Sequence, residues 1–251
     1  MLTHFSRSIG APVLTALMLL LSAGAIRPAA AEDTNSYSLK HALDSKFVKA
    51  LICATGASSG YVLILAIKSQ IDSALQITVP SGTVLENNDA NAQSMVVHGV
   101  VGEYDSDVGD EIAEKCAEAA EEEERNSNNG PDLSQHWLQA DTITLDPHQS
   151  GMYLLSAYCL EFEKDNPGSS DRLIAVGAAS GELARLYSYL DGKLDAYDVD
   201  TIQLATWAVS GDESADHIAS KYGYSADAKK NACQLLSDAG INAGGKALCS
   251  Q

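Results

Sequence analysis

Residues 152–162 read MYLLSAYCLEF, and they form the last strongly apolar run before the pattern of the chain changes. A strongly apolar stretch of this length, with aromatic residues in it, is typical of a buried β-strand. Beyond residue 180 the apolar residues recur at helical spacing, beginning with Leu183, Leu186 and Leu190. Strands followed by helices indicate the α+β class.

Short strands are also predicted earlier in the chain. Residues 61–67, YVLILAI, are apolar and rich in β-branched side chains, and residues 74–79, ALQITV, alternate apolar with polar. A turn at Pro80-Ser81-Gly82 follows, and further strands are expected at 83–85, 94–97 and 142–145. Short strands separated by turns favour an antiparallel β-sandwich. We therefore predict this sandwich over residues 61–180, with residues 32–60 as a polar leader.

Two further segments complete the predicted organisation. Residues 103–132 contain Glu121–Glu124 and then an Asn-rich stretch, which predicts an acidic helix of roughly four turns running into a loop. Residues 181–251 are expected to be a helical portion of the same domain, with helices at 181–190, 201–210, 214–222 and 226–239. For the last of these, Ser225 is a candidate N-cap, and Gly240 follows its end.

The first 31 residues have the pattern of a secretory signal peptide. Arg7 provides a basic start, residues 12–26 are apolar, and Ala29-Ala30-Ala31 supplies small residues for cleavage. This predicts cleavage near Ala31 and a secreted or periplasmic location. The apolar run is short for a membrane span, and no later run reaches spanning length. We therefore expect an exported protein without a membrane span.

Composition excludes several classes of function. The net charge of −18 repels phosphate backbones, so nucleic acid is not an expected partner. The sequence has no phosphate-binding loop, no nucleophile elbow and no histidine pair at zinc-ligand spacing, so we predict no enzyme, cofactor or metal centre. The acidic stretches 105–111 and 191–200 leave Ca²⁺ binding as an alternative, although the first does not match an EF-hand loop.

The chain has five cysteines, all after the predicted cleavage site. Disulfides persist in exported proteins, but an odd number leaves at least one cysteine unpaired. A Gly-rich return could bring Cys249 back to Cys233, and Cys53 with Cys116 is the next plausible pair. Cys159 would then be left over, although a Cys53–Cys159 pair remains an alternative.

Gln203 has two possible roles. It lies near the start of the helix in residues 201–210, where Asp200 could cap the first amides and Gln203 could complete a capping box. In this interpretation Gln203 only starts a helix, and Cys159 is a small buried or disulfide-bonded side chain.

Taken together, the two segments resemble the thioester domain of bacterial surface adhesins. The matching residues are Tyr158-Cys159-Leu160 on a strand and Ile202-Gln203-Leu204-Ala205-Thr206-Trp207 on a helix, within residues 152–211. In that family the Cys sulfur and the Gln side-chain carbonyl form an internal thioester, which captures amines on a host surface. The resemblance implies a Cys159–Gln203 bond supported by Tyr158, Ala205 and Trp207. The chain differs from the family at Ile202, where Thr is usual, and at Thr206, where an aliphatic residue is usual.

The chemistry implied by this resemblance is coherent. A thiolate must attack the Gln203 carboxamide and expel ammonia, so Cys159 needs a lowered pKa or a base. Amides at a helix N-terminus could hold the oxyanion that forms. The candidates for proton transfer are His136, His148, Tyr153 and Glu161.

The sequence thus predicts a secreted protein that attaches to a surface protein or another amine-bearing ligand. The alternative is a β-sandwich module that binds a partner non-covalently, in which Gln203 caps a helix and Cys159 is buried or disulfide-bonded.

Overall fold

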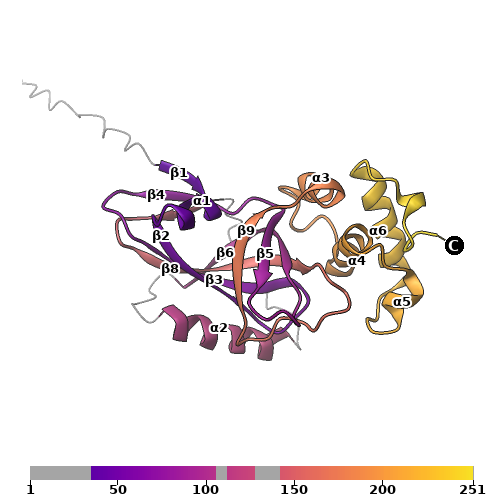
Figure 1. Cartoon of the computed structure of the whole chain (residues 1–251), viewed down its shortest axis with the longest axis horizontal. Coiled ribbons are helices and arrows are strands. Elements are labelled where there is room, and N and C mark those ends of the chain that lie inside the picture. Colours follow the sequence, from indigo (N-terminus) through magenta and orange to yellow (C-terminus); the bar gives the residue numbers. More distant parts are fainter. Residues whose placement is uncertain (1–34, 106–111, 128–141, 251) are drawn as a thin grey trace, which may run out of the picture. The chain divides into compact units, whose positions relative to one another are not determined.

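Six of the apolar strands close into a barrel in a computed structural model that describes residues 35–105, 112–127 and 142–250 (Figure 1). The strand order is β2-β3-β8-β6-β5-β9, and every pairing is antiparallel. The barrel closes where Ile52 of β2 pairs with Leu173 of β9. The strands are β2 (Val48–Ala54), β3 (Ser59–Ser69), β5 (Thr83–Asn87), β6 (Met95–Asp105), β8 (Ser150–Cys159) and β9 (Arg172–Ala178).

The α+β class is confirmed. The predicted β-sandwich is wrong, because the strands close into a barrel. Two of the strands that close it were not expected. The predicted leader over residues 32–60 contains β2, and β9 was missed altogether. Strand β2 carries Lys49 among apolar residues, and β9 has exposed Ile174 and Val176 between its buried positions, so neither shows simple alternation. These are the two strands that join the ends of the sheet.

A smaller sheet of three strands lies outside the barrel order. It contains β1 (Asn35–Ser38), β4 (Leu75–Thr78) and β7 (Thr142–Leu145), in the order β1-β4-β7. The short helix α1 (Leu39–Asp44) connects β1 to β2, and Ser38 caps it by accepting a hydrogen bond from His41 N at 3.3 Å. Strands β4 and β7 were predicted, whereas β1 and α1 also lie in the segment expected to be a leader.

The predicted acidic helix is confirmed as α2 (Ile112–Ser127), which packs on the outer face of β2 and β3. Its contact side includes Cys116 and Ala119, which join a second hydrophobic cluster with Ile64 and Met152 of the barrel. The disulfide Cys53–Cys116 fixes the helix to β2. Because α2 covers this outer face, β3 is buried on both sides, which explains its continuous apolar sequence.

Four helices and a 3-10 turn follow the barrel. They are α3 (Gly181–Leu190), α4 (Val199–Ser210), α5 (Ala215–Ala219), α6 (Ala226–Asp238) and η1 (Ala243–Gly245). Helix α4 contacts β8, β3, α3 and α6, and every residue from 201 to 208 is buried. A helix that is buried all round shows little amphipathic pattern. The α4 helix therefore joins the barrel to the other helices.

The N-terminal caps of α6 and α4 test two predictions made from the sequence. Ser225 caps α6 as predicted, because its side chain accepts a hydrogen bond from Ala228 N at 3.0 Å. Helix α4 begins two residues before the predicted start. Its cap is Asp198, whose Oδ1 accepts from Thr201 N at 2.8 Å. Gln203 thus lies beyond the first turn, and the predicted capping role of Gln203 and Asp200 is wrong.

The cysteine pairing agrees with the sequence-based prediction. Cys53 bonds to Cys116, Cys233 bonds to Cys249, and Cys159 is a free, buried cysteine. The alternative Cys53–Cys159 pair is excluded by this arrangement. Two disulfides fit a protein that folds in an oxidising compartment.

Among the helices of the described ranges, none combines the length and the apolar character needed to cross a membrane. The described residues form one compact unit.

We predict that the Cys233–Cys249 disulfide stabilises the C-terminal helices. The double variant C233S/C249S should lower the free energy of unfolding by about 3 kcal/mol, because a loop of this size loses its closure constraint in the unfolded chain. Urea unfolding followed by circular dichroism measures the difference. With reductant present, wild type and variant should unfold alike, and equal stabilities without reductant would contradict the prediction.

Candidate functional site

Cys159 and Gln203 are brought into contact by the junction between the barrel and α4. Cys159 is the last residue of β8, and Gln203 lies in the second turn of α4. Both residues are 0% exposed, although 44 residues separate them in the sequence. The two residues that the resemblance singled out therefore lie together in the core.

The carboxamide of Gln203 makes two hydrogen bonds with the main chain of Cys159. Its Oε1 accepts from Cys159 N at 3.0 Å, and its Nε2 donates to Cys159 O at 2.9 Å. The Cys159 N–H is shared, since it also donates to Ser58 O at 3.0 Å. The side chain thus pairs with one residue of the strand much as a neighbouring strand would, and both of its polar ends are satisfied.

The neighbouring residues of α4 hold Gln203 in this position. Ile202 and Leu204 are fully buried on either side of it. Thr206, one turn on, donates from Oγ1 to Ile202 O at 2.8 Å and lies 2.9 Å from the hydroxyl of Tyr187 on α3. Buried polar groups of this kind are tolerated only when they are hydrogen-bonded, so the network fixes the rotation of α4 about its axis.

The thiol of Cys159 is not activated as a free nucleophile. Burial raises its pKa strongly, and the nearby carboxylate of Glu161 raises it further. The thiol therefore stays protonated at neutral pH, and its reaction with a reagent in solution requires both exposure and loss of the proton. The Gln203 carboxamide, which is hydrogen-bonded to the main chain of the same residue, can meet the thiol without such exposure.

Of the three candidates for proton transfer that the structure describes, one lies near Cys159. Glu161 is two residues away, where its Oε2 accepts from Ser94 N at 2.6 Å and its Oε1 lies 3.3 Å from Lys164 Nζ. His148 is exposed and contacts Asp72 at 2.7 Å. Tyr153 precedes Cys159 by six residues on β8, which places it ~20 Å away along an extended strand. His136 lies outside the described residues.

The three supporting residues are all buried at this junction. Tyr158 is 2% exposed and Ala205 is fully buried. Trp207 is 2% exposed and packs edge-on against Phe162 and Tyr222, at ring-centroid distances of 4.9 and 5.1 Å. The Trp207 Nε1 is buried without a hydrogen-bond partner. This leaves one unsatisfied donor beside the site.

Sequence reasoning missed His98 and Tyr187, which border the same region. His98 on β6 is 2% exposed, its Nε2 lies 3.0 Å from Leu190 O, and its Nδ1 has no partner. Its ring lies 6.1 Å from that of Tyr158 and 6.3 Å from that of Tyr187. Burial lowers the pKa of His98, so its ring is neutral at neutral pH. A single histidine within an apolar strand gave no signal in the sequence.

The residues that the structure describes contain no cluster of three or more His, Cys, Asp or Glu side chains suited to a metal ion. In the acidic stretch 191–200, Asp198 caps α4 and Asp200 accepts from the hydroxyl of Tyr222 at 2.7 Å. Asp195 accepts from the hydroxyl of Tyr61 at 3.1 Å. In the other stretch, residues 106–111 lie outside the described ranges. A pocket of about 340 Å³ lies between α1, the turn at residues 80–83 and β9, and shares no residue with the Cys159–Gln203 site.

The arrangement suits one intramolecular reaction. The main chain of Cys159 holds the Gln203 carboxamide through two hydrogen bonds. Rotation about the Cα–Cβ bond of Cys159 changes the distance between its sulfur and the carbon of that carboxamide. The Cys159 N–H already donates to Oε1, the atom on which negative charge would develop during attack at that carbon. Proximity and a positioned donor can together replace much of the activation that the buried thiol lacks.

Comparison with known proteins adds no assignment. No protein-family model matches the chain, and no significant match is found among curated proteins or solved structures.

We predict that the Gln203 carboxamide contributes strongly to stability. Gln203→Ala should lower the free energy of unfolding by about 2–5 kcal/mol, because it leaves the Cys159 carbonyl unpaired and opens a cavity. Chemical denaturation measures this change. The matched control is Gln234→Ala on α6, where the side chain is exposed and a change within about 0.5 kcal/mol is expected. Equal effects of the two variants would show that the Gln203 contact is not important.

Proposed function

We propose that this protein is an exported attachment protein that forms an internal thioester between Cys159 and Gln203 and uses it to capture an amine on a partner. The observation that carries the proposal is the contact of the Gln203 carboxamide with the backbone of an unpaired, fully buried cysteine. The resemblance to adhesin thioester domains rests on the same two residues. The pairing of the other four cysteines supports it, since it leaves Cys159 free to react.

The bond-forming step balances without any further reactant. The Cys159 sulfur attacks the carboxamide carbon of Gln203, and the carbon–nitrogen bond breaks. The thiol proton ends on the departing nitrogen, which leaves as ammonia. The product is a thioester whose carbonyl oxygen keeps the Cys159 N–H as its donor. An apolar surrounding protects such a bond from water, and both side chains lie fully out of solvent.

The capture step uses the thioester once. An amine of the partner attacks the carbonyl carbon that came from Gln203, and the carbon–sulfur bond breaks. An amide then joins the two molecules, and the sulfur of Cys159 becomes a thiol again by taking the proton that the amine loses. Nothing returns the site to its starting state, so the proposed activity is a single covalent attachment rather than enzymatic turnover.

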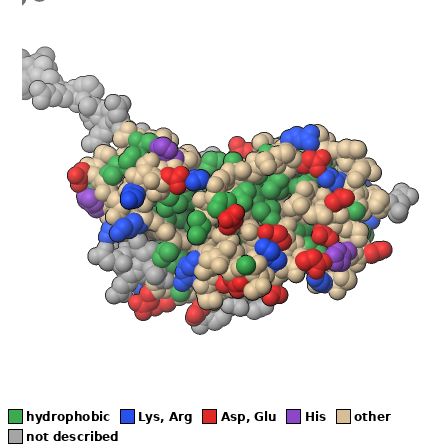
Figure 2. All heavy atoms as spheres, viewed as in Figure 1, with side chains coloured by type: hydrophobic (Ala, Val, Ile, Leu, Met, Phe, Trp, Pro, Cys, Tyr) green, Lys and Arg blue, Asp and Glu red, His purple; other side chains and the backbone are tan. Residues whose placement is uncertain are grey.

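The second candidate function is a module that binds its partner without a covalent bond. Both polar ends of Gln203 are satisfied by Cys159, which is also what a purely structural link between β8 and α4 would require. In this alternative, Ile174 and Val176 on β9 offer a binding surface, since they are 60% and 37% exposed. Figure 2 shows hydrophobic side chains gathered in the middle of one face, where Figure 1 draws β9 and β5.

We predict that the unreduced protein, purified after export, is lighter than its sequence and disulfides require by the mass of one ammonia. Incubation with methylamine should then add the mass of one methylamine, because the amine opens the thioester. Intact-mass spectrometry measures both changes. The site assignment is checked by peptide mapping, which should find the added group on Gln203.

Two variants serve as controls for the mass measurement. Cys159→Ser removes the sulfur, and Gln203→Ala removes the carboxamide, so each should retain its full calculated mass and ignore methylamine. A wild-type mass that only the two disulfides explain, unchanged by methylamine, would rule out the thioester. Gln203 would then be a structural link, and the non-covalent module would be the remaining function.

A further inference from the structure

The segment from Glu213 to Tyr222, which contains α5 and which we call the α5 segment, lies against α4 beside Gln203. The ring of Tyr222 packs edge-on against Trp207 at 5.1 Å, and its hydroxyl donates to Asp200 at 2.7 Å. Asp200 and Trp207 lie about one helical turn before and after Gln203 on α4. The side chain of Tyr222 therefore spans the part of α4 that carries Gln203.

The α5 segment also contacts the loop that leaves Cys159. His217 packs edge-on against Phe162 at 5.1 Å, and Lys221 Nζ lies 5.3 Å from the centre of the same ring. Phe162 follows Cys159 by three residues and also contacts Trp207, at a ring-centroid distance of 4.9 Å. Aromatic side chains from the loop, from α4 and from the α5 segment thus form one layer at this end of β8.

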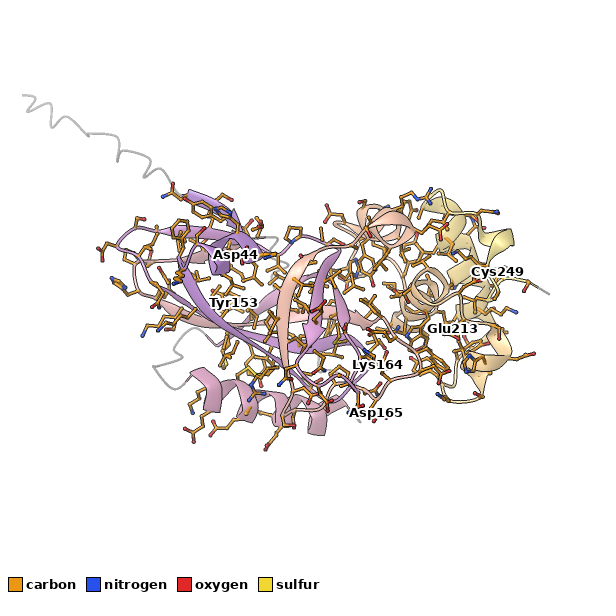
Figure 3. The ribbon with its side chains drawn as sticks, viewed as in Figure 1. Asp44, Tyr153, Lys164, Asp165, Glu213 and Cys249 are labelled. Carbon is orange, nitrogen blue, oxygen red and sulfur yellow. A yellow bond between two sulfur atoms is a disulfide. The ribbon has the colours of Figure 1, made fainter. Side chains whose placement is uncertain are left out.

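An ion pair with Lys221 and a contact with His217, both made by Glu163, fasten the α5 segment to the loop. Glu163 Oε1 lies 2.6 Å from His217 Nε2, and Glu163 Oε2 lies 2.5 Å from Lys221 Nζ. The other ring nitrogen of His217 lies 2.7 Å from Glu213 Oε2, so both nitrogens face carboxylates. Lys221, and then His217, lower the pKa of Glu163, which keeps this carboxylate ionised at neutral pH. Figure 2 shows acidic side chains around a histidine near the position of α5. Figure 3 labels Glu213 next to the C-terminal helices, and Lys164 between it and the barrel strands in that view.

These contacts are of a kind that opens easily. The contacts of Glu163 with Lys221 and His217 are exposed to solvent, and exposed ion pairs contribute little to stability. Helix α5 has five residues, and Ile218 is its one buried side chain. In the closed arrangement the buried Trp207 Nε1 has no acceptor. Displacement of the segment would let this donor reach water or a carbonyl oxygen, which offsets part of the cost of opening.

We propose that the α5 segment is a lid over Cys159 and Gln203, fastened by Glu163, and that its opening admits the amine-bearing partner. The proposal rests on the proposed function for the identity of the molecule admitted, but the lid itself can be tested without it. Full burial of both residues means that any reagent must wait for an opening. Local opening of a small, weakly held segment needs less free energy than global unfolding.

The test measures how fast a small reagent reaches the site in the exported, unreduced protein. If wild type lacks the mass of one ammonia, the reagent is methylamine and the readout is its incorporation. If wild type has its full mass, Cys159 is a free thiol, and the reagent is iodoacetamide. Glu163→Gln removes the carboxylate that contacts both Lys221 and His217 and should increase the rate up to about fivefold. Tyr222→Ala removes the ring over α4 and should increase it about tenfold.

The matched control is Glu182→Gln, which removes the ion pairs of Glu182 with Arg185 and Lys246 instead. Its rate should equal that of wild type. Rates for Glu163→Gln and Tyr222→Ala that match this control would overturn the lid, whichever reagent applies. Because Glu163 is exposed, its variant should fold even where the tyrosine variant does not, and circular dichroism at the assay temperature checks both. The wild-type mass decides the thioester separately from the lid.

Discussion

The pairing of the Gln203 carboxamide with the backbone of Cys159 ties the two halves of this protein together. Cys159 ends β8, the strand that lies between β3 and β6 in the barrel, and Gln203 lies on the helix that contacts α3 and α6. A buried amide without partners would cost several kcal/mol. The two hydrogen bonds remove this cost only if α4 has one particular position along its axis and one particular rotation about it, relative to the end of β8. Helices α3 and α6 pack against α4, so the position of α4 also sets theirs.

The same interaction limits the chemistry that the site can perform. A thiol with a raised pKa, held out of solvent, is a poor nucleophile toward molecules in solution. Against a carboxamide that is hydrogen-bonded to the main chain of the same cysteine, the low concentration of thiolate would matter less, because proximity replaces a bimolecular encounter. Under the proposed function, the reaction within the chain therefore precedes the reaction with a partner. The α5 segment and Phe162 would then decide when the product of that reaction meets an amine.

Burial from two sides explains several features of the sequence at once. Strands β3 and β8 face the barrel interior with one side and are covered by α2 on part of the other, so their sequences are apolar without alternation. Helix α4 is enclosed by the barrel and by α3 and α6, so its sequence shows no polar stripe. The disulfides hold the two outer layers: Cys53–Cys116 fastens α2, and Cys233–Cys249 fastens the end of the chain to α6.

The sequence by itself determined the elements whose patterns are local. The apolar runs predicted β3 and β8, helical spacing and Ser225 predicted α3 and α6, and the odd cysteine pointed to Cys159. Only the tertiary structure decided how the sheet closes, because β2 and β9 complete the barrel by pairing Ile52 with Leu173, which are distant in the sequence, rather than through a pattern of their own. The tertiary structure also shows that Gln203 makes a core contact rather than capping a helix. Asp198 caps α4, which begins two residues before the predicted start. Contacts between distant residues depend on which surfaces are left to be buried, and no window of the sequence contains that information.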